Sequence, residues 1–280
     1  MITISAIYTY PIKSCGGLAH EMHALDARGL RYDRRWMVVT PEGQFLTARD
    51  VPRLLLVQPE MASDVMRLHM AGRPVLEVPL EQDVRGRRRM VEVWGDRVAA
   101  VDEGEEAAAW FSAVVGQPVR LVSIADDFSR VINTEYVDQP TETGFADGYP
   151  LLLIGEASLD ALNERLRAKG EAPVPMSRFR PNVVVRGTAP FEEDTWRQVR
   201  LGDVPFDVVK PCKRCVITTL DPSTGEAPNP KEPTATLAAF RRWNGGVIFG
   251  QNVVHRSLGV LRVGQPAAVE RVSHGWLQEG

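Results

Sequence analysis

The amino-acid sequence predicts a mainly β protein with some α structure, of the α+β class. Most of the chain consists of short runs in which apolar and polar residues alternate, the period of a half-buried strand. Turn-forming residues separate these runs, for example Pro-Glu-Gly at 41–43, Ala-Gly-Arg-Pro at 71–74 and Gly-Asp at 95–96. Because the runs are short and closely spaced, an antiparallel barrel or sandwich is favoured over a doubly wound sheet.

The expected strands lie on both sides of a helix near residue 110. In the first hundred residues they are 2–10, 36–40, 54–57, 65–70, 75–78 and 90–94. Later in the chain they are 119–124, 150–154, 182–186, 206–209, 215–219, 247–254 and 260–263. The segment 138–144, within the polar stretch 126–148, and the basic cluster 85–89 are expected to be solvated loops. We place a domain boundary near residues 115–130.

The segments with a helical period are 105–115, 156–169 and 233–242. In the first of them Trp110, Phe111 and Val114 fall on one face, and Gly116 ends the helix. We interpret the apolar faces of all three segments as core contacts rather than cofactor contacts.

Composition and charge exclude several classes of protein. The chain is 44% hydrophobic and 25% charged, which is typical of a globular protein. A net charge of -3 gives no reason to expect nucleic acid or a membrane surface as a partner. No apolar run approaches the ~18 residues of a membrane helix, and the first ten residues resemble a strand rather than a signal peptide. Three cysteines, an odd number, favour a reducing compartment, so we expect a cytoplasmic protein.

Cys212 and Cys215 have the C-x-x-C spacing. This spacing serves in half of a zinc site, in a dithiol redox pair, or in soft-metal binding through one thiolate. Zinc is disfavoured because no second spaced pair of ligands is present, and a dithiol pair is disfavoured because residues 215–219 are expected to form a strand. Two interpretations stay open. One is a buried, inert pair, and the other is a single thiolate made acidic by Lys210, Lys213 and Arg214.

Lys13 and Ser14 lie in a glycine-rich turn after the first expected strand. A cation, a hydroxyl and exposed backbone N–H groups form a cradle for an anion. A hairpin turn with an exposed lysine has the same sequence pattern, so this alternative also stays open.

Two further polar groups interrupt apolar segments. Arg180 and Asn182 enter an expected strand; arginine suits phosphate, and asparagine can both donate to and accept from the edge of a heterocycle. Gln251 and Asn252 place two amides in an otherwise apolar strand, which indicates a site or a bulge. Neither G-x-G-x-x-G nor a Walker sequence is present.

These residues, in this order, resemble the MOSC-domain proteins, the family of the molybdenum cofactor sulfurase C-terminal domain. The chain is most similar to the branch that contains the mitochondrial amidoxime-reducing components and their bacterial relatives. The resemblance covers nearly the whole chain, and its matching stretches are 10–15, 29–36, 46–49, 145–151, 156–159, 178–182, 212–225, 231–233 and 249–251.

The resemblance implies two β-barrel-like domains with a few peripheral helices: an MOSC N-terminal barrel at 1–120 and an MOSC barrel at 121–280. It also implies a molybdenum cofactor, in which a pterin dithiolene holds the metal and ends in a phosphate. The metal ligand of the C-x-R-C motif falls on Cys215, and Cys212 is either a neighbouring thiol or the ligand itself. Asp147 falls near the metal. The positions that match pterin, phosphate or other cofactor contacts are Lys13, Ser14, Arg34, Arg180, Asn182, Arg214, Gln251 and Asn252.

The resemblance implies a molybdenum-dependent reductase of N-hydroxylated or N-oxide compounds, in which Cys215 holds the metal and Asp147 moves a proton. Some bacterial relatives carry an iron–sulfur domain, but this sequence has only three cysteines and cannot supply the four ligands of such a cluster. Electrons are therefore expected from a separate ferredoxin- or flavoprotein-like donor. The alternative is a non-redox cofactor carrier or sulfur-transfer module that uses a cysteine persulfide.

Overall fold

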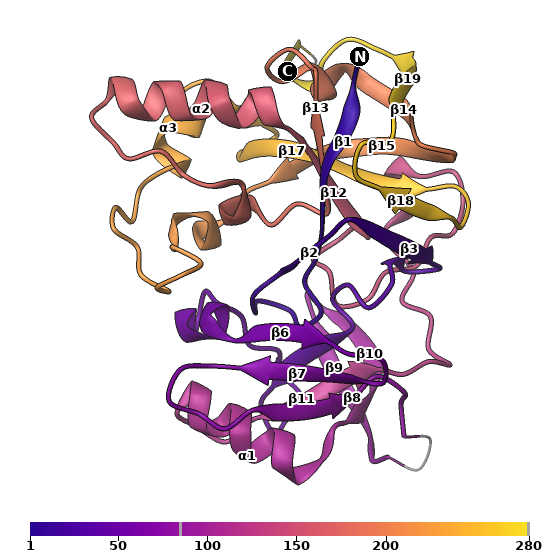
Figure 1. Cartoon of the computed structure of the whole chain (residues 1–280), viewed down its shortest axis with the longest axis vertical. Coiled ribbons are helices and arrows are strands. Elements are labelled where there is room, and N and C mark those ends of the chain that lie inside the picture. The colour runs from indigo at the N-terminus through magenta and orange to yellow at the C-terminus, as the bar shows by residue number, and fades with distance from the viewer. Residues whose placement is uncertain (84–85, 279–280) are drawn as a thin grey trace.

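The computed structural model describes residues 1–83 and 86–278, which form two bodies stacked along the long axis of the molecule (Figure 1). The upper body in this view is built on one large sheet, and both chain ends lie there. Along the main path of that sheet the strands are β19 (Ala267–Val272), β14 (Trp196–Leu201), β15 (Val204–Lys213), β17 (Gly246–His255), β12 (Leu151–Gly155), β13 (Val183–Arg186), β1 (Thr3–Thr9) and β2 (Leu18–His20). A short strand, β16 (Arg242–Trp243), pairs with β17 beside this path.

Neighbouring strands of the large sheet are antiparallel except β12 and β13, which are parallel. A parallel pair needs a long crossover, and α2 (Glu156–Ala168) supplies it. Leu162 and Leu166 of this helix are buried against the sheet beside Ile154 and Phe249. The other helix of this body, α3 (Thr234–Ala238), packs against β17 and α2.

The strand order of the large sheet is an open path, so the expected closed barrel is not formed by the described residues. The sheet nevertheless curls back on itself. The Ile4 amide donates to the Gln265 carbonyl and the Ala267 amide to the Ile2 carbonyl, each at 2.9 Å. The concave side therefore encloses an apolar core whose largest side chains are Trp196 and Phe206.

The lower body consists of two small antiparallel sheets and one helix. One sheet has the order β5 (Trp36–Val39), β11 (Arg120–Ile124), β10 (Asp96–Asp102) and β9 (Arg88–Val93). The other is formed by β6 (Gln58–Met61), β7 (Val65–His69) and β8 (Leu76–Pro79). Helix α1 (Gly104–Val115) buries Trp110 and Phe111 in the core of this body and ends at Gly116, whose φ of 88° suits a residue without a Cβ atom.

A third small sheet lies beside the large one and joins β18 (Val260–Arg262), β3 (Met22–Asp26) and β4 (Gly29–Leu30). Short 3₁₀ helices complete the chain: η1 (Pro52–Leu56), η2 (Thr134–Tyr136), η3 (Met176–Phe179), η4 (Glu192–Thr195), η5 (Val216–Thr219) and η6 (Trp276–Gln278). Within the described part of the chain, no helix is long and apolar enough to span a bilayer.

Two predicted strands, 54–57 and 215–219, are wrong, because both segments form 3₁₀ helices. Periodicity does not distinguish a short buried strand from a short helix. The helix predicted at 233–242 is also too long, since its last residue already belongs to β16.

The basic cluster 85–89 is only partly a loop. Arg88 and Arg89 begin β9, and Arg85 lies outside the described residues. The domain division at residue 120 stays a prediction. The two bodies do not follow this division strictly, because β1, from the first 120 residues, pairs with β13 in the large sheet of the upper body.

Candidate functional site

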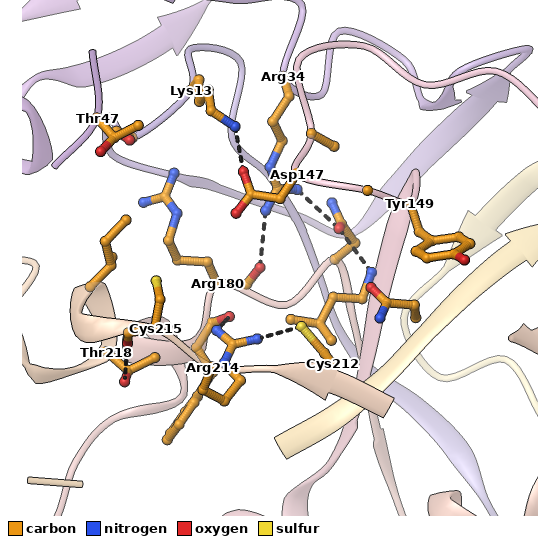
Figure 2. A pocket seen from close by; sticks show the side chains of 18 of the residues that line it. Lys13, Arg34, Thr47, Asp147, Tyr149, Arg180, Cys212, Arg214, Cys215 and Thr218 are labelled. Carbon is orange, nitrogen blue, oxygen red and sulfur yellow. Dashed lines mark hydrogen bonds and ion pairs between the residues drawn. The ribbon is translucent and has the colours of Figure 1, made fainter. Parts of the chain in front are cut away.

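A pocket lies between segments from the two halves of the sequence (Figure 2). Its lining is mainly cationic and polar, with apolar side chains on part of the wall. The first half of the chain contributes Lys13, Ser14, Arg34, Thr47, Arg49 and Trp94. The second half contributes Ala146, Asp147, Gly148, Tyr149, Leu151, Leu152, Phe179, Arg180, Asn182, Cys212, Arg214, Cys215, Ile217, Thr218 and Asn252.

Four lining residues have a left-handed backbone although none is glycine. Their φ values are 69° for Ser14, 46° for Arg34, 53° for Trp94 and 54° for Arg180. Each lies in a turn or at the end of a short helix, where the chain changes direction at the pocket. Non-glycine residues in this region are strained, and such strain is concentrated at functional sites.

Arg34 and Arg180 enclose the buried ring of Tyr10. Their guanidinium carbons lie 4.4 Å and 4.2 Å from the ring centroid. Burial raises the pKa of Tyr10 to about 12, so the ring is a neutral platform, and burial lowers the pKa of Arg180 to about 10. Arg180 thus remains charged at neutral pH, and the Arg34 guanidinium lies against the same ring.

Asn182 and Asp33 hold Arg34 in place. Arg34 Nη1 donates to Asp33 Oδ2 at 2.5 Å and to Asn182 Oδ1 at 3.0 Å. Asn182 Oδ1 also accepts from the Leu152 amide, and its Nδ2 donates to the Tyr8 carbonyl. Asn182 therefore uses its side chain to fix the pocket wall, which explains why a polar residue is tolerated directly before β13.

Lys13 and Asp147, which are far apart in the sequence, form an ion pair in the pocket (Figure 2). Burial lowers the pKa of Lys13, and Asp147 opposes this shift. The protein around Asp147 displaces water, which alone would raise its pKa. The charge and hydrogen bond of Lys13, with a hydrogen bond from Trp94, outweigh this effect and hold the pKa of Asp147 well below its usual range. Asp147 is therefore a carboxylate at neutral pH.

Two side chains that hold Asp147, those of Trp94 and Arg49, were not among the candidate residues inferred from the sequence. Trp94 Nε1 donates to Asp147 Oδ1 at 3.1 Å, and the Arg49 guanidinium lies 3.9 Å from Asp147 Oδ2. Arg49 also covers the Trp94 ring, with its guanidinium carbon 4.5 Å from the centroid. A tryptophan directly before the glycine of an expected turn is a sequence signal that could have indicated Trp94. Thr47, Tyr149 and Thr218 were also missed.

Arg130 fixes the loop that carries Asp147. Its side chain is buried and donates to the carbonyls of Gly144 at 2.8 Å and Ala146 at 2.7 Å. Its Nε donates to Asp96 at 2.9 Å, in the strand that follows Trp94. One side chain thus joins the Asp147 loop to the β9–β10 hairpin.

The substitution Arg130→Met should lower the free energy of unfolding by about 1–3 kcal/mol, because two buried carbonyls lose a charged donor. Urea denaturation measures this change, and hydrogen exchange at residues 145–147 should become faster. Arg88→Met is the matched control, since Arg88 and its partner Asp127 are both largely exposed and their pair contributes little. Equal stability of the two variants would contradict the role given to Arg130.

The two cysteines of the C-x-x-C motif both line the pocket but have different surroundings. Arg214 Nη1 donates to Cys212 Sγ at 3.0 Å, and its Nη2 donates to the Phe179 carbonyl at 2.7 Å. Cys215 is the residue before η5, and its carbonyl accepts from the Thr218 hydroxyl at 3.0 Å (Figure 2). The pair is not buried, contrary to the first interpretation, because both residues are partly exposed and line the pocket.

Of the three expected cations, Arg214 is the one that donates a hydrogen bond to Cys212, and Lys210 lies close enough for its charge to interact with that thiol. Lys213 Nζ donates to the Asn244 carbonyl, and Lys210 Nζ lies over the rings of Tyr136 and Tyr149. Neither lysine is part of the pocket lining.

Gln251 lies outside the pocket, contrary to expectation, whereas Asn252 lines it. Successive side chains of a strand point to opposite faces, so two adjacent residues of β17 do not share one site. Gln251 is fully buried, and its Nε2 donates to Asp194 Oδ1 at 2.7 Å. Asn252 donates from Nδ2 to the Lys210 and Pro211 carbonyls, at 3.3 Å each.

The chemistry of the pocket suits an anionic ligand with an additional soft atom. The cations Lys13, Arg34, Arg49, Arg180 and Arg214 line it. The carboxylates paired with them are Asp33 and Asp147. Within residues 1–83 and 86–278, no three His, Cys, Asp or Glu side chains come together as a metal cage. A metal in this pocket would therefore take most of its ligands from a bound molecule, with a cysteine thiolate as the protein's ligand.

Similarity to known proteins extends over almost the whole chain. Residues 1–118 match the model of the MOSC N-terminal beta barrel domain, and residues 140–268 match that of the MOSC domain. Mitochondrial amidoxime-reducing component 1 of Mus musculus is 35% identical over 94% of this chain and 81% of its own length. Mitochondrial amidoxime reducing component 2 of Rattus norvegicus is 36% identical over 94% of this chain and 82% of its own length.

A molybdenum cofactor sulfurase of Oryza sativa subsp. japonica is 31% identical over the whole of this chain, which spans 35% of that protein. The two consecutive matches to family models, together with relatives similar over most of both lengths, show that the chain belongs to the MOSC family.

Proposed function

We propose that this protein binds a molybdenum cofactor and reduces N-hydroxylated or N-oxide compounds with electrons from a separate donor protein. The observation that carries the proposal is a cysteine thiol, Cys215, in a pocket with a surplus of cations, in a chain similar over most of its length to amidoxime-reducing components.

The residues of the pocket fit such a cofactor. Arg180 Nη2 and Arg214 Nε are buried nitrogens with no hydrogen-bond partner within the described residues. Buried guanidinium groups with free donors suit the phosphate and heteroatoms of a large anionic ligand. A thiolate suits a metal that is already bound by sulfur. The residues that would hold the group are Lys13, Ser14, Arg34, Arg180, Arg214 and Asn252, with Cys215 as the metal ligand.

When bound, the molybdenum cofactor supplies two-electron redox chemistry at its metal. Reduction of an amidoxime to an amidine and water consumes two electrons and two protons. Lys13 is the group that holds a proton beside Asp147, because Asp147 itself remains a carboxylate at neutral pH. We therefore assign proton transfer to the Lys13–Asp147 pair, in which Lys13 donates to the Asp147 carboxylate and Asp147 opposes the lowering of the Lys13 pKa by burial.

A second candidate function is sulfur transfer or cofactor transport without a redox step. Arg214 donates to Cys212 Sγ, which stabilises a charged sulfur at that position. The similarity to a molybdenum cofactor sulfurase also supports this alternative. In native mass spectrometry, a labile adduct of one sulfur atom on a cysteine, without reductase activity, would favour it.

Protein purified from a cofactor-producing host tests the proposed function directly. With reduced methyl viologen as electron donor, it should reduce amidoximes and hydroxylamines, and the products are measured by chromatography. Lys13→Met should lose most of this activity, because the variant lacks both the cation and the proton at Asp147. A protein loaded with molybdenum that leaves every N-hydroxylated substrate unchanged would contradict the proposal.

A further inference from the structure

The tip of the β9–β10 hairpin carries a residue that the turn itself does not favour. Val93 pairs with Asp96, so the connection consists of Trp94 and Gly95 alone. Their φ values are 53° and 89°, which is the pattern of a type I′ turn. Such turns favour Asn-Gly, because a bulky residue is strained at positive φ. The backbone therefore does not explain why tryptophan occupies this position.

The Trp94 side chain is fixed at the pocket and yet partly open to it. Asp147 accepts its indole N–H, and Arg49 and Lys13 lie over the ring at 4.5 Å and 5.7 Å from its centroid. The Phe45 ring meets it edge-on with the centroids 4.8 Å apart. Despite these contacts, 42% of its surface remains exposed. The protein thus holds a large aromatic side chain in one orientation while leaving part of it free for a ligand.

The pocket also has apolar side chains close to the thiol. Ile217 lines it two residues after Cys215, and the intervening Val216 is 53% exposed. The lining also includes the five cations Lys13, Arg34, Arg49, Arg180 and Arg214. An entering molecule with a polar reactive group and an apolar body would find a matching surface for each part.

We propose that Trp94 contacts the substrate and selects N-hydroxylated compounds that carry a flat aromatic group over those that carry a small aliphatic one. This inference rests on the proposed function of the same pocket. Aromatic rings attract one another in offset-stacked or edge-to-face arrangements, and a fixed indole loses little conformational freedom when a second ring packs on it.

The test compares benzamidoxime with acetamidoxime, which share the reacting group and differ in a phenyl or a methyl substituent. In Trp94→Asn the turn receives its favoured residue, so the hairpin remains folded while the ring is lost. The ratio of kcat/KM for benzamidoxime to that for acetamidoxime should fall about 3- to 10-fold. In the matched variant Trp94→Phe, which keeps a ring but loses the N–H bond to Asp147, most of the ratio should be retained.

An equal loss for both substrates would overturn the inference, since Trp94 would then act only through Asp147. Loss of molybdenum from Trp94→Asn would overturn it as well, because the indole would then hold the cofactor. Calorimetric binding of both compounds without reductant separates this inference from the proposed function. If the wild type reduces neither compound, the proposed function fails. Binding then still tests the role of Trp94: tighter binding of benzamidoxime that is lost in Trp94→Asn supports the inference, and equal binding of the two compounds overturns it.

Discussion

Replacing Cys215 by alanine is expected to remove nearly all molybdenum from the purified protein. Under the proposed function, Cys215 would carry the protein's bond to the metal, and the described residues form no cluster of three or more His, Cys, Asp or Glu side chains that could hold the metal without it. Removing a residue that only hydrogen-bonds to a metal ligand lowers metal affinity about 10–100-fold. Removing the ligand itself should lower it further. Elemental analysis measures the metal, and oxidation to a fluorescent product measures the pterin.

Cys212→Ala is the matched control, because it removes a thiol from the same pocket. Its sulfur already accepts a hydrogen bond from Arg214, so we expect this variant to retain its molybdenum. If Cys212→Ala loses the metal and Cys215→Ala keeps it, the ligand is Cys212. If both variants and the wild type lack metal and pterin in a cofactor-rich host, the proposal of a molybdenum protein is wrong.

Much of the pocket could be predicted from the sequence because its residues lie in distinctive short motifs. Lys13, Arg180 and Cys215 come from segments far apart in the chain, and the structure brings them to one pocket. Several strands, such as β1, and the helix α1 could be predicted as well, because their apolar periods are regular, whereas β10, β14 and β19 were not predicted. The resemblance connected these segments, whereas their spacing alone left several kinds of site open.

The remaining features depend on contacts between segments that no local pattern reveals. Asn182 has the residue type of a ligand contact but is used to hold Arg34 and the backbone of β12. Arg130 is one arginine in a polar stretch, and only the folded chain shows that it fixes the Asp147 loop. The short helix η5 was mistaken for a strand because four apolar and β-branched residues fit either structure.

Gln251 shows how a polar residue in an apolar strand can belong to the core. Its amide donates to Asp194, whose other partner is Arg241, and all three side chains are buried. Arg241 Nη2 donates to Asp194 Oδ1 at 2.9 Å, and its guanidinium carbon lies 4.4 Å from the Phe191 centroid. This group joins η4, β17 and the residues after α3, and none of its three side chains lines the pocket, although the next residue of β17, Asn252, does.

Asp194→Ala is therefore expected to be the most destabilising of the substitutions considered. It leaves the guanidinium of Arg241 buried without its anion, and breaking a buried pair in this way costs about 3–5 kcal/mol. For a chain of this size the melting temperature should fall on the order of 10 °C, measured by circular dichroism or calorimetry. Asp127→Ala is the control, since it removes an exposed carboxylate from a surface pair and should leave the melting temperature nearly unchanged.

The substitution Gln251→Leu tests whether Gln251 stabilises the core or helps to bind the cofactor. The leucine fills a similar volume but donates no hydrogen bond to Asp194, so the melting temperature should fall by less than in Asp194→Ala. Molybdenum per folded molecule should equal that of the wild type, because Gln251 does not line the pocket. A loss of molybdenum without a loss of stability would show that Gln251 takes part in cofactor binding. It would contradict the placement of the Gln251 side chain outside the pocket.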